Sequence, residues 1–141
     1  MYRVSLENRG DSRFYASTKD ATLVIDTQGQ GANPGDALLA GLCGCIGFYA
    51  REYLTKEAKV TSPSFSIDAE AAPTPDGARL ASATVWIDLG GLALDNAQRA
   101  ALLNHAQKCR LLATLRSGCP IEVQLGRPKA GVGPELAARA I

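Results

Sequence analysis

The chain has 141 residues, of which 46% are hydrophobic and 21% charged. This composition is that of an ordinary globular protein and excludes long-range disorder, collagen-like repeats and a coiled-coil rod. The length fits one domain, or one subunit whose core a partner completes. Fifteen basic and fourteen acidic residues give a net charge of +1, whereas domains that bind nucleic acids usually have a clear basic surplus. We therefore expect a single domain over residues 1–141 and no nucleic-acid partner.

The sequence predicts neither export nor membrane insertion. No segment reaches the roughly 18 apolar residues of a membrane span, and the first residues lack the long apolar stretch of a signal peptide. We therefore expect a cytoplasmic location, where thiols stay reduced and cysteines are structural, metal-bound or reactive. The chain has four of them: Cys43, Cys45, Cys109 and Cys119.

The first 26 residues predict a small antiparallel meander. Apolar and polar residues alternate from residue 2 to 7, which is the period of a strand. The pattern resumes over residues 13–17 and 21–26, with turn-forming residues between the segments. Residues 27–35 are rich in glycine and predict a loop that ends at the start of a helix.

A helix is predicted from Pro34 to Leu54. Pro34 suits the first turn of a helix, and the carboxylate of Asp36 is favoured there by the helix dipole. Residues 37–50 contain no charge, which is typical of a helix buried on most sides. Each glycine in a helix interior costs about 1 kcal/mol relative to alanine, so the three glycines indicate close approach of another backbone. These are Gly41, Gly44 and Gly47.

The second half of the chain predicts a hairpin followed by helices. Residues 60–71 and 83–89 alternate around a turn at 73–77, with Trp86 on the face opposite the aliphatic residues. Asp95 and Gln98 are spaced as a capping box for a helix that ends near Lys108.

A short helix, a last strand and a weakly patterned tail complete the prediction, at residues 109–116, 119–125 and 126–141. The predicted order is βββ-α-ββ-α-(α)-β. Because strands come in blocks instead of alternating strictly with helices, the fold class is α+β.

Two of the cysteines lie on the predicted central helix. Cys45 shares an apolar stripe with Leu38, Leu42 and Tyr49, whereas Cys43 lies about 200° around the helix. The two thiols therefore cannot share one pocket. A free cysteine is often only a small buried hydrophobic residue, and the periodicity by itself favours that interpretation for each of them.

His105 and Cys109 are four residues apart, so a continuous helix would place them on one face. His105 could lower the pKa of the Cys109 thiol as a nearby cation. With Cys45 the pair could form a metal site, but no CxxC or HxxxH framework supports one, and we expect no metal. The favoured interpretation is that His105 is an ordinary helix residue. Cys119, at the start of a predicted strand, is expected to be structural.

The residues from Asn33 to Cys45 resemble the signature of the OsmC and organic hydroperoxide resistance family. That signature is a proline, a nearby acidic residue, a run rich in Leu and Ala, and a cysteine eleven residues after the proline, which here is Cys45. The family's second cysteine opens a short helix that follows a longer one, as Cys109 does. The resemblance extends over about residues 2 to 125.

The resemblance implies an intertwined homodimer with an OsmC-like fold, in which two long central helices pack together between sheets shared by the subunits. It also implies a thiol peroxidase that needs no metal, flavin or other cofactor. Cys45 would attack an organic hydroperoxide and become a sulfenic acid. Cys109 would then form a disulfide with it, and an external thiol reductant would reduce that disulfide.

The chain departs from the hydroperoxide resistance branch around these thiols. In that branch a Glu follows the proline and supports the thiolate together with an Arg from an N-terminal loop. Here Gly35 takes the place of the Glu and Asp36 comes one residue later. The matching arginine is Arg9, with Arg13 close by. The second cysteine is followed by Arg110 instead of a proline, and Arg110 favours a thiolate if its side chain points inward.

Three functions are therefore carried forward. The leading hypothesis is reduction of organic hydroperoxides by Cys45 and Cys109. The alternatives are non-enzymatic binding of an apolar ligand at the dimer interface and thiol–disulfide exchange. The order of the thiols also has two interpretations. Local charge favours attack by Cys109, which lies between Lys108 and Arg110 and is expected to be the less buried thiol, whereas the family motif favours attack by Cys45.

Overall fold

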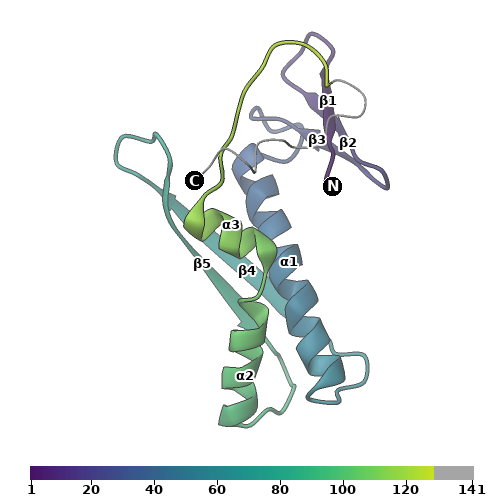
Figure 1. Cartoon of the computed structure of the whole chain (residues 1–141), viewed down its shortest axis with the longest axis vertical. Helices are drawn as coiled ribbons and strands as arrows, with labels where there is room; N and C mark the ends of the chain where they lie inside the picture. The colour runs from purple at the N-terminus through teal and green to yellow at the C-terminus, as the bar shows by residue number, and fades with distance from the viewer. Residues whose placement is uncertain (129–141) are drawn as a thin grey trace.

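The computed structural model describes residues 1–128 and has the predicted α+β architecture (Figure 1). A three-stranded antiparallel sheet lies at the N-terminal end of one long helix, and a two-stranded hairpin packs along that helix. Two shorter helices follow and pack against the long helix as well. The long helix therefore contacts the hairpin and both shorter helices.

The predicted N-terminal meander is confirmed. It consists of β1 (Ser5–Asn8), β2 (Phe14–Ser17) and β3 (Thr22–Ile25), hydrogen-bonded in the order β1-β2-β3. Gly10 adopts a φ of 98° in the first turn, a conformation that residues with a Cβ rarely take. The strands are short, and of their residues only Ala16 is fully buried.

The loop between β3 and the long helix is organised around one buried acid, Asp26, whose exposed fraction is 2%. Its two carboxylate oxygens accept hydrogen bonds from the backbone N–H groups of Gln28 at 3.1 Å and Gln30 at 2.9 Å. Gly31 follows, and a Cβ there would lie 2.6 Å from the Val24 carbonyl oxygen. A larger residue could therefore not occupy this position without displacing the backbone of β3.

The long helix α1 (Pro34–Lys56) begins where the sequence predicts and extends two residues beyond the predicted end. Asn33 is its N-cap and accepts a hydrogen bond from the Gly35 N–H at 2.9 Å. The buried face of α1 supplies half of the hydrophobic core. The core residues on this helix are Leu42, Ile46, Ala50, Tyr53 and Leu54.

The hairpin consists of β4 (Ser66–Pro73) and β5 (Leu80–Asp88). Ile67 pairs with Ile87, and both pack against the core, whereas Asp68 pairs with Trp86 on the other face. Trp86 is half exposed, as the alternation predicts.

The glycines of α1 have different surroundings. A Cβ on Gly47 would lie 3.0 Å from the Ile67 Cδ1 atom, so this glycine lets the hairpin approach the helix. A Cβ on Gly44 would meet no atom of the described chain within 4 Å. The close neighbour of Gly47 is thus a side chain of the hairpin and not the predicted backbone, and the surface over Gly44 is open.

The capping box at Asp95 and Gln98 is confirmed, with both reciprocal hydrogen bonds present. The helix that it starts, α2 (Asn96–Ala106), ends two residues before the predicted end at Lys108. The short helix α3 (Arg110–Ser117) follows as predicted.

The strand predicted over residues 119–125 is not formed, which corrects the sequence analysis. This segment runs from α3 toward the three-stranded sheet (Figure 1) but pairs with no strand among residues 1–128. Ile121 and Val123 are 83% and 93% exposed. The alternation is present in the sequence, but a strand also needs hydrogen bonds to a neighbouring strand, and this segment forms no such pairing within residues 1–128. Most of the predicted tail, residues 129–141, lies outside the described residues.

No helix among residues 1–128 is both long enough and apolar enough to span a lipid bilayer.

Replacement of Asp26 by Asn tests the role of the buried acid. The backbone hydrogen bond from Gln28 lowers the pKa of Asp26, with a smaller contribution from Gln30, although burial alone would raise it. A depressed folded-state pKa stabilises the fold above the unfolded pKa of about 3.9 and ceases to do so as the pH falls through the folded value. We expect Asp26→Asn to be less stable than wild type at pH 7.

The difference should shrink when urea unfolding is measured at progressively lower pH. If the destabilisation by Asp26→Asn persisted unchanged below the folded-state and unfolded-state pKa values of Asp26, the carboxylate charge would not explain how this residue stabilises the fold.

Candidate functional site

The structure brings together two cysteines that are far apart in the sequence. Cys45 lies in the middle of α1, and Cys109 lies directly before α3, which packs across α1. Their thiols are neighbours, and each influences the ionisation of the other. Both are free thiols, with Cys45 partly buried and Cys109 fully buried.

Cys109 is the N-cap residue of α3. Its Sγ atom accepts a hydrogen bond from the Leu112 N–H at 3.3 Å, one of the first N–H groups of a helix that have no partner within the helix. This position corrects the expectation that Cys109 is the less buried of the two thiols. It is buried because a capping side chain turns back over its helix, and here that side faces the core beside α1.

The start of α3 also acts on Cys45. Burial by itself raises the pKa of the Cys45 thiol, but hydrogen bonding to the Cys109 thiol and to the backbone N–H groups of Leu111 and Arg110 lowers it, as does the Arg110 charge. The net pKa is below the ordinary value of a cysteine. Cys45 is therefore the thiol that this environment favours as a thiolate.

The pKa of the Cys109 thiol is shifted in the opposite direction. Burial raises the pKa of its thiol, and the adjacent Cys45 raises it further. Local charge in the sequence, Lys108 and Arg110 on either side, suggested that Cys109 was the better thiolate. In the structure burial has the largest effect on this thiol, and the flanking cations are not among the groups that shift its pKa, so the structure favours a pair in which Cys45 is the more acidic thiol.

Two of the predicted site residues lie apart from the thiols. The Arg9 guanidinium forms an ion pair with Glu7 at 3.1 Å and lies 4.2 Å from the centre of the Tyr15 ring. Asp36 is exposed in the first turn of α1. Neither forms a hydrogen bond or ion pair with the cysteines or Arg110 in the part of the chain that the structure describes.

Arg110 is the cation that does act on Cys45, and its side chain has a partner that sequence reasoning missed. Its Nη1 atom donates a hydrogen bond to the hydroxyl oxygen of Tyr2 at 3.2 Å. The two residues are 108 positions apart, so no local pattern could have indicated the contact.

His105 does not share a helix face with Cys109, because α2 ends at Ala106. Its Nε2 atom instead lies 2.9 Å from the Glu52 carboxylate on α1. The rings of Tyr49 and Tyr53 pack about it, with centroids at 6.1 and 6.0 Å. The histidine therefore links α1 to α2 and does not act on the Cys109 thiol.

The other two cysteines lie apart from this pair. Burial raises the pKa of Cys43, and the charge of Asp68 adds to the effect, so this thiol stays protonated. Cys119 is exposed, whereas a structural cysteine was expected there. Among the described residues, no group of three His, Cys, Asp or Glu side chains could hold a metal ion.

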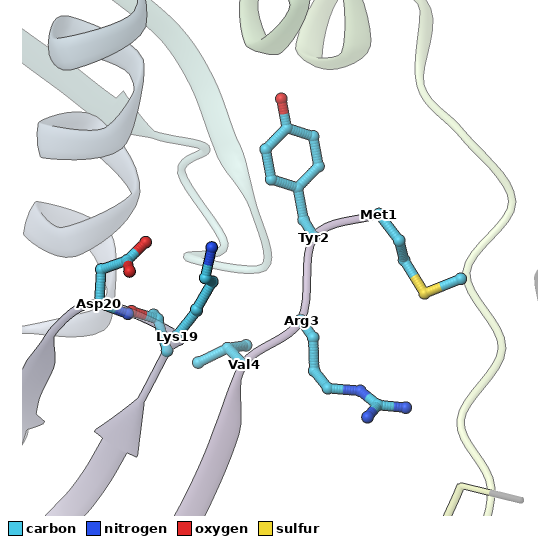
Figure 2. A pocket seen from close by; sticks show the side chains of 7 residues that line it. Met1, Tyr2, Arg3, Val4, Lys19 and Asp20 are labelled. Atoms are coloured by element: carbon cyan, nitrogen blue, oxygen red, sulfur yellow. The ribbon is translucent and has the colours of Figure 1, made fainter. Parts of the chain in front are cut away.

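A cavity of about 450 Å³ opens beside the N-terminal segment (Figure 2). The Tyr2 side chain forms part of its wall, so the cavity lies next to the Tyr2–Arg110 contact. None of its lining residues is a cysteine. They are Met1, Tyr2, Arg3, Val4, Thr18, Lys19 and Asp20.

Comparison with known families gives a match between residues 27–124 and the model of the OsmC-like proteins. The chain belongs to the OsmC-like family. No curated protein sequence matches this family member significantly.

Solved structures show the same fold. An OsmC-like protein from Mycoplasma pneumoniae has 17% identity and a TM-score of 0.70, with 84% of this chain and 89% of that chain covered. The organic hydroperoxide resistance protein OhrB of Bacillus subtilis has 19% identity and a TM-score of 0.58, with 84% and 92% covered. At these identities the likeness concerns the fold, and the OsmC-like order of elements predicted from the sequence is confirmed for the described helices and for β1 to β5.

Two substitutions at Cys109 separate its capping role from its core contacts. Serine keeps an acceptor for the Leu112 N–H, whereas alanine removes it. Because loss of an N-cap acceptor typically costs about 1 kcal/mol, we expect Cys109→Ala to be less stable than Cys109→Ser by roughly that amount. Urea unfolding under reducing conditions measures the difference. Equal stability of the two variants would contradict the conclusion that the Cys109 side chain stabilises α3 as its N-cap.

Proposed function

We propose that this OsmC-like protein is a thiol-dependent peroxidase that reduces organic hydroperoxides, with Cys45 as the attacking thiol and Cys109 as the resolving thiol. The observation that supports this most directly is the pairing of an acidified thiol with a protonated one at the start of α3. Membership of a family that includes organic hydroperoxide resistance proteins favours a role in defence against peroxide stress.

The reaction requires only the two thiols and an external thiol reductant. The Cys45 thiolate attacks the distal oxygen of the hydroperoxide, the O–O bond breaks, and the alkoxide takes a proton and leaves as the alcohol. Cys45 is then a sulfenic acid. The Cys109 sulfur attacks Cys45, water leaves, and a disulfide forms, which two equivalents of external thiol reduce.

The surroundings of Cys45 favour an apolar substrate. Leu111 and Leu115 on α3 and Leu38 on α1 are large apolar side chains that remain about half exposed near the thiol-bearing elements. An apolar surface next to a thiolate favours a lipid-like or aromatic hydroperoxide over hydrogen peroxide.

We also propose that the protein is a homodimer with the site at the subunit interface. The helix surface over Gly44 is open, and Phe48, one turn further along the same face of α1, is well exposed. The unpaired segment 119–125 exposes an alternating apolar face. Such surfaces are usually covered by a partner in solution. Light scattering at micromolar concentration should give about twice the monomer mass of 14.8 kDa, and a monomer would contradict the proposal.

Peroxidase activity is tested by consumption of cumene hydroperoxide and of hydrogen peroxide, with dithiols and monothiols as reductants. We expect faster consumption of cumene hydroperoxide, and loss of activity in Cys45→Ser. Cys119→Ser is the matched control, because this cysteine is exposed and does not act on the ionisation of either thiol of the pair. Because only the thiolate attacks, the rate should fall as the pH falls through the pKa of Cys45.

The roles of the thiols are tested by trapping. Cys109→Ser should leave a sulfenic acid that can be trapped at Cys45 after one turnover, whereas Cys45→Ser should leave none at Cys109. Trapping at Cys109 would reverse the roles. No trapping and no turnover would favour the non-enzymatic binding of an apolar ligand at the dimer interface. Reduction of disulfides without turnover of peroxide would favour thiol–disulfide exchange.

A further inference from the structure

Arg110 begins α3 directly after the capping cysteine, so its position along the backbone is fixed by the helix. Its side chain is not fixed in the same way. It is exposed and forms no ion pair within residues 1–128. An arginine side chain has many rotamers, and an exposed one tends to extend into water, where its charge is screened. A cation that is to act steadily on a neighbouring thiol therefore needs a partner.

The hydroxyl of Tyr2 is the partner that the structure supplies. It is the one side-chain group among the described residues that accepts a hydrogen bond from Arg110. Figure 2 shows the Tyr2 ring extending away from Val4 and Lys19, toward the helix above it. Tyr2 is 85% exposed, so burial of apolar surface does not explain this orientation.

We propose that Tyr2 is a positioning residue whose hydroxyl holds the Arg110 guanidinium at the start of α3, where its charge acts on the Cys45 thiol. Tyr2 forms no hydrogen bond with either sulfur within the described chain and acts only through Arg110. The inference deepens the proposed function, because it concerns the reactivity of the same attacking thiol.

The contact also connects two parts of the molecule. Tyr2 precedes β1, so its hydrogen bond joins the three-stranded sheet to the thiol-bearing helices. Within the described chain, no other hydrogen bond joins residues 1–26 to residues beyond 34. Tyr2 thus lines the cavity and also accepts the hydrogen bond from Arg110. A change at Tyr2 should therefore alter the reactivity of the Cys45 thiol.

The test measures the nucleophilicity of Cys45 without peroxide. Alkylation by iodoacetamide is followed against pH by mass spectrometry, in protein carrying Cys43→Ala so that the peptide has one cysteine. Tyr2→Phe removes only the hydroxyl. Loss of one solvent-exposed hydrogen bond of ordinary strength should slow alkylation at pH 7 by roughly twofold to tenfold and move the pH profile to higher pH. Arg110→Ala should have at least the same effect.

The double variant Tyr2→Phe/Arg110→Ala should be no slower than Arg110→Ala alone, because Tyr2 acts through Arg110. Tyr15→Phe, which removes a hydroxyl in the same sheet, and Arg116→Ala, which removes an arginine at the other end of α3, are the matched controls and should leave the profile unchanged. An unchanged profile in Tyr2→Phe, or additive effects in the double variant, would overturn the proposal.

The outcome is separable from that of the peroxidase assay. If the wild type does not turn over hydroperoxide but the alkylation profile still depends on Tyr2 and Arg110, the positioning role stands and the peroxidase proposal fails. If the wild type turns over hydroperoxide but Tyr2→Phe leaves the alkylation profile unchanged, the peroxidase proposal stands and the positioning role of Tyr2 fails. Circular dichroism of each variant verifies the fold, and Arg110→Gln replaces Arg110→Ala should the latter not fold.

Discussion

The thiol site depends on one contact, in which the N-terminus of α3 packs against the middle of α1. The first N–H groups of α3 lack partners within the helix, and three of them bear on the thiols. One is satisfied by the Cys109 sulfur as N-cap, and two act on the Cys45 sulfur. The start of α3 therefore supplies hydrogen-bond donors that stabilise a thiolate, and the two sulfurs supply the acceptors that the N-terminus of this helix lacks. Without the approach of α3, Cys45 would be only a small, partly buried hydrophobic residue on α1.

The same contact explains why two cysteines with the same chemistry differ in ionisation. Both are partly or fully buried, which raises the pKa of a thiol in each case. Cys45 faces donors and the Arg110 charge, whereas Cys109 faces mainly the core and its neighbour. A pair of this kind suits a reaction in which one sulfur attacks as a thiolate and the other attacks only after the first is oxidised.

The remainder of the chain holds this contact in place with unequal strength. The core formed by α1, α2 and the hairpin is continuous, and the Glu52–His105 pair adds a polar link between the two longer helices. The N-terminal sheet is joined more lightly, through the loop around Asp26 and the Tyr2–Arg110 hydrogen bond. The segment after α3 has an apolar face that the described chain leaves uncovered.

Local signals in the sequence determined the elements of this protein. Strand alternation gave the meander and the hairpin, the capping box gave the start of α2, and the Pro34-to-Cys45 motif indicated the family. The partners within the site could not be obtained in this way, because the contacts of Arg110 with Tyr2 and of His105 with Glu52 join residues 108 and 53 positions apart. The burial of the Cys109 thiol could not be read from the sequence either. The charges beside Cys109 in the sequence suggested an exposed thiol, and only the tertiary structure turned that side chain into the core. The alternation over residues 119–125 is visible in the sequence, but a strand forms only by hydrogen bonding to a neighbouring strand, and that pairing depends on the tertiary path of the segment, which no local pattern contains.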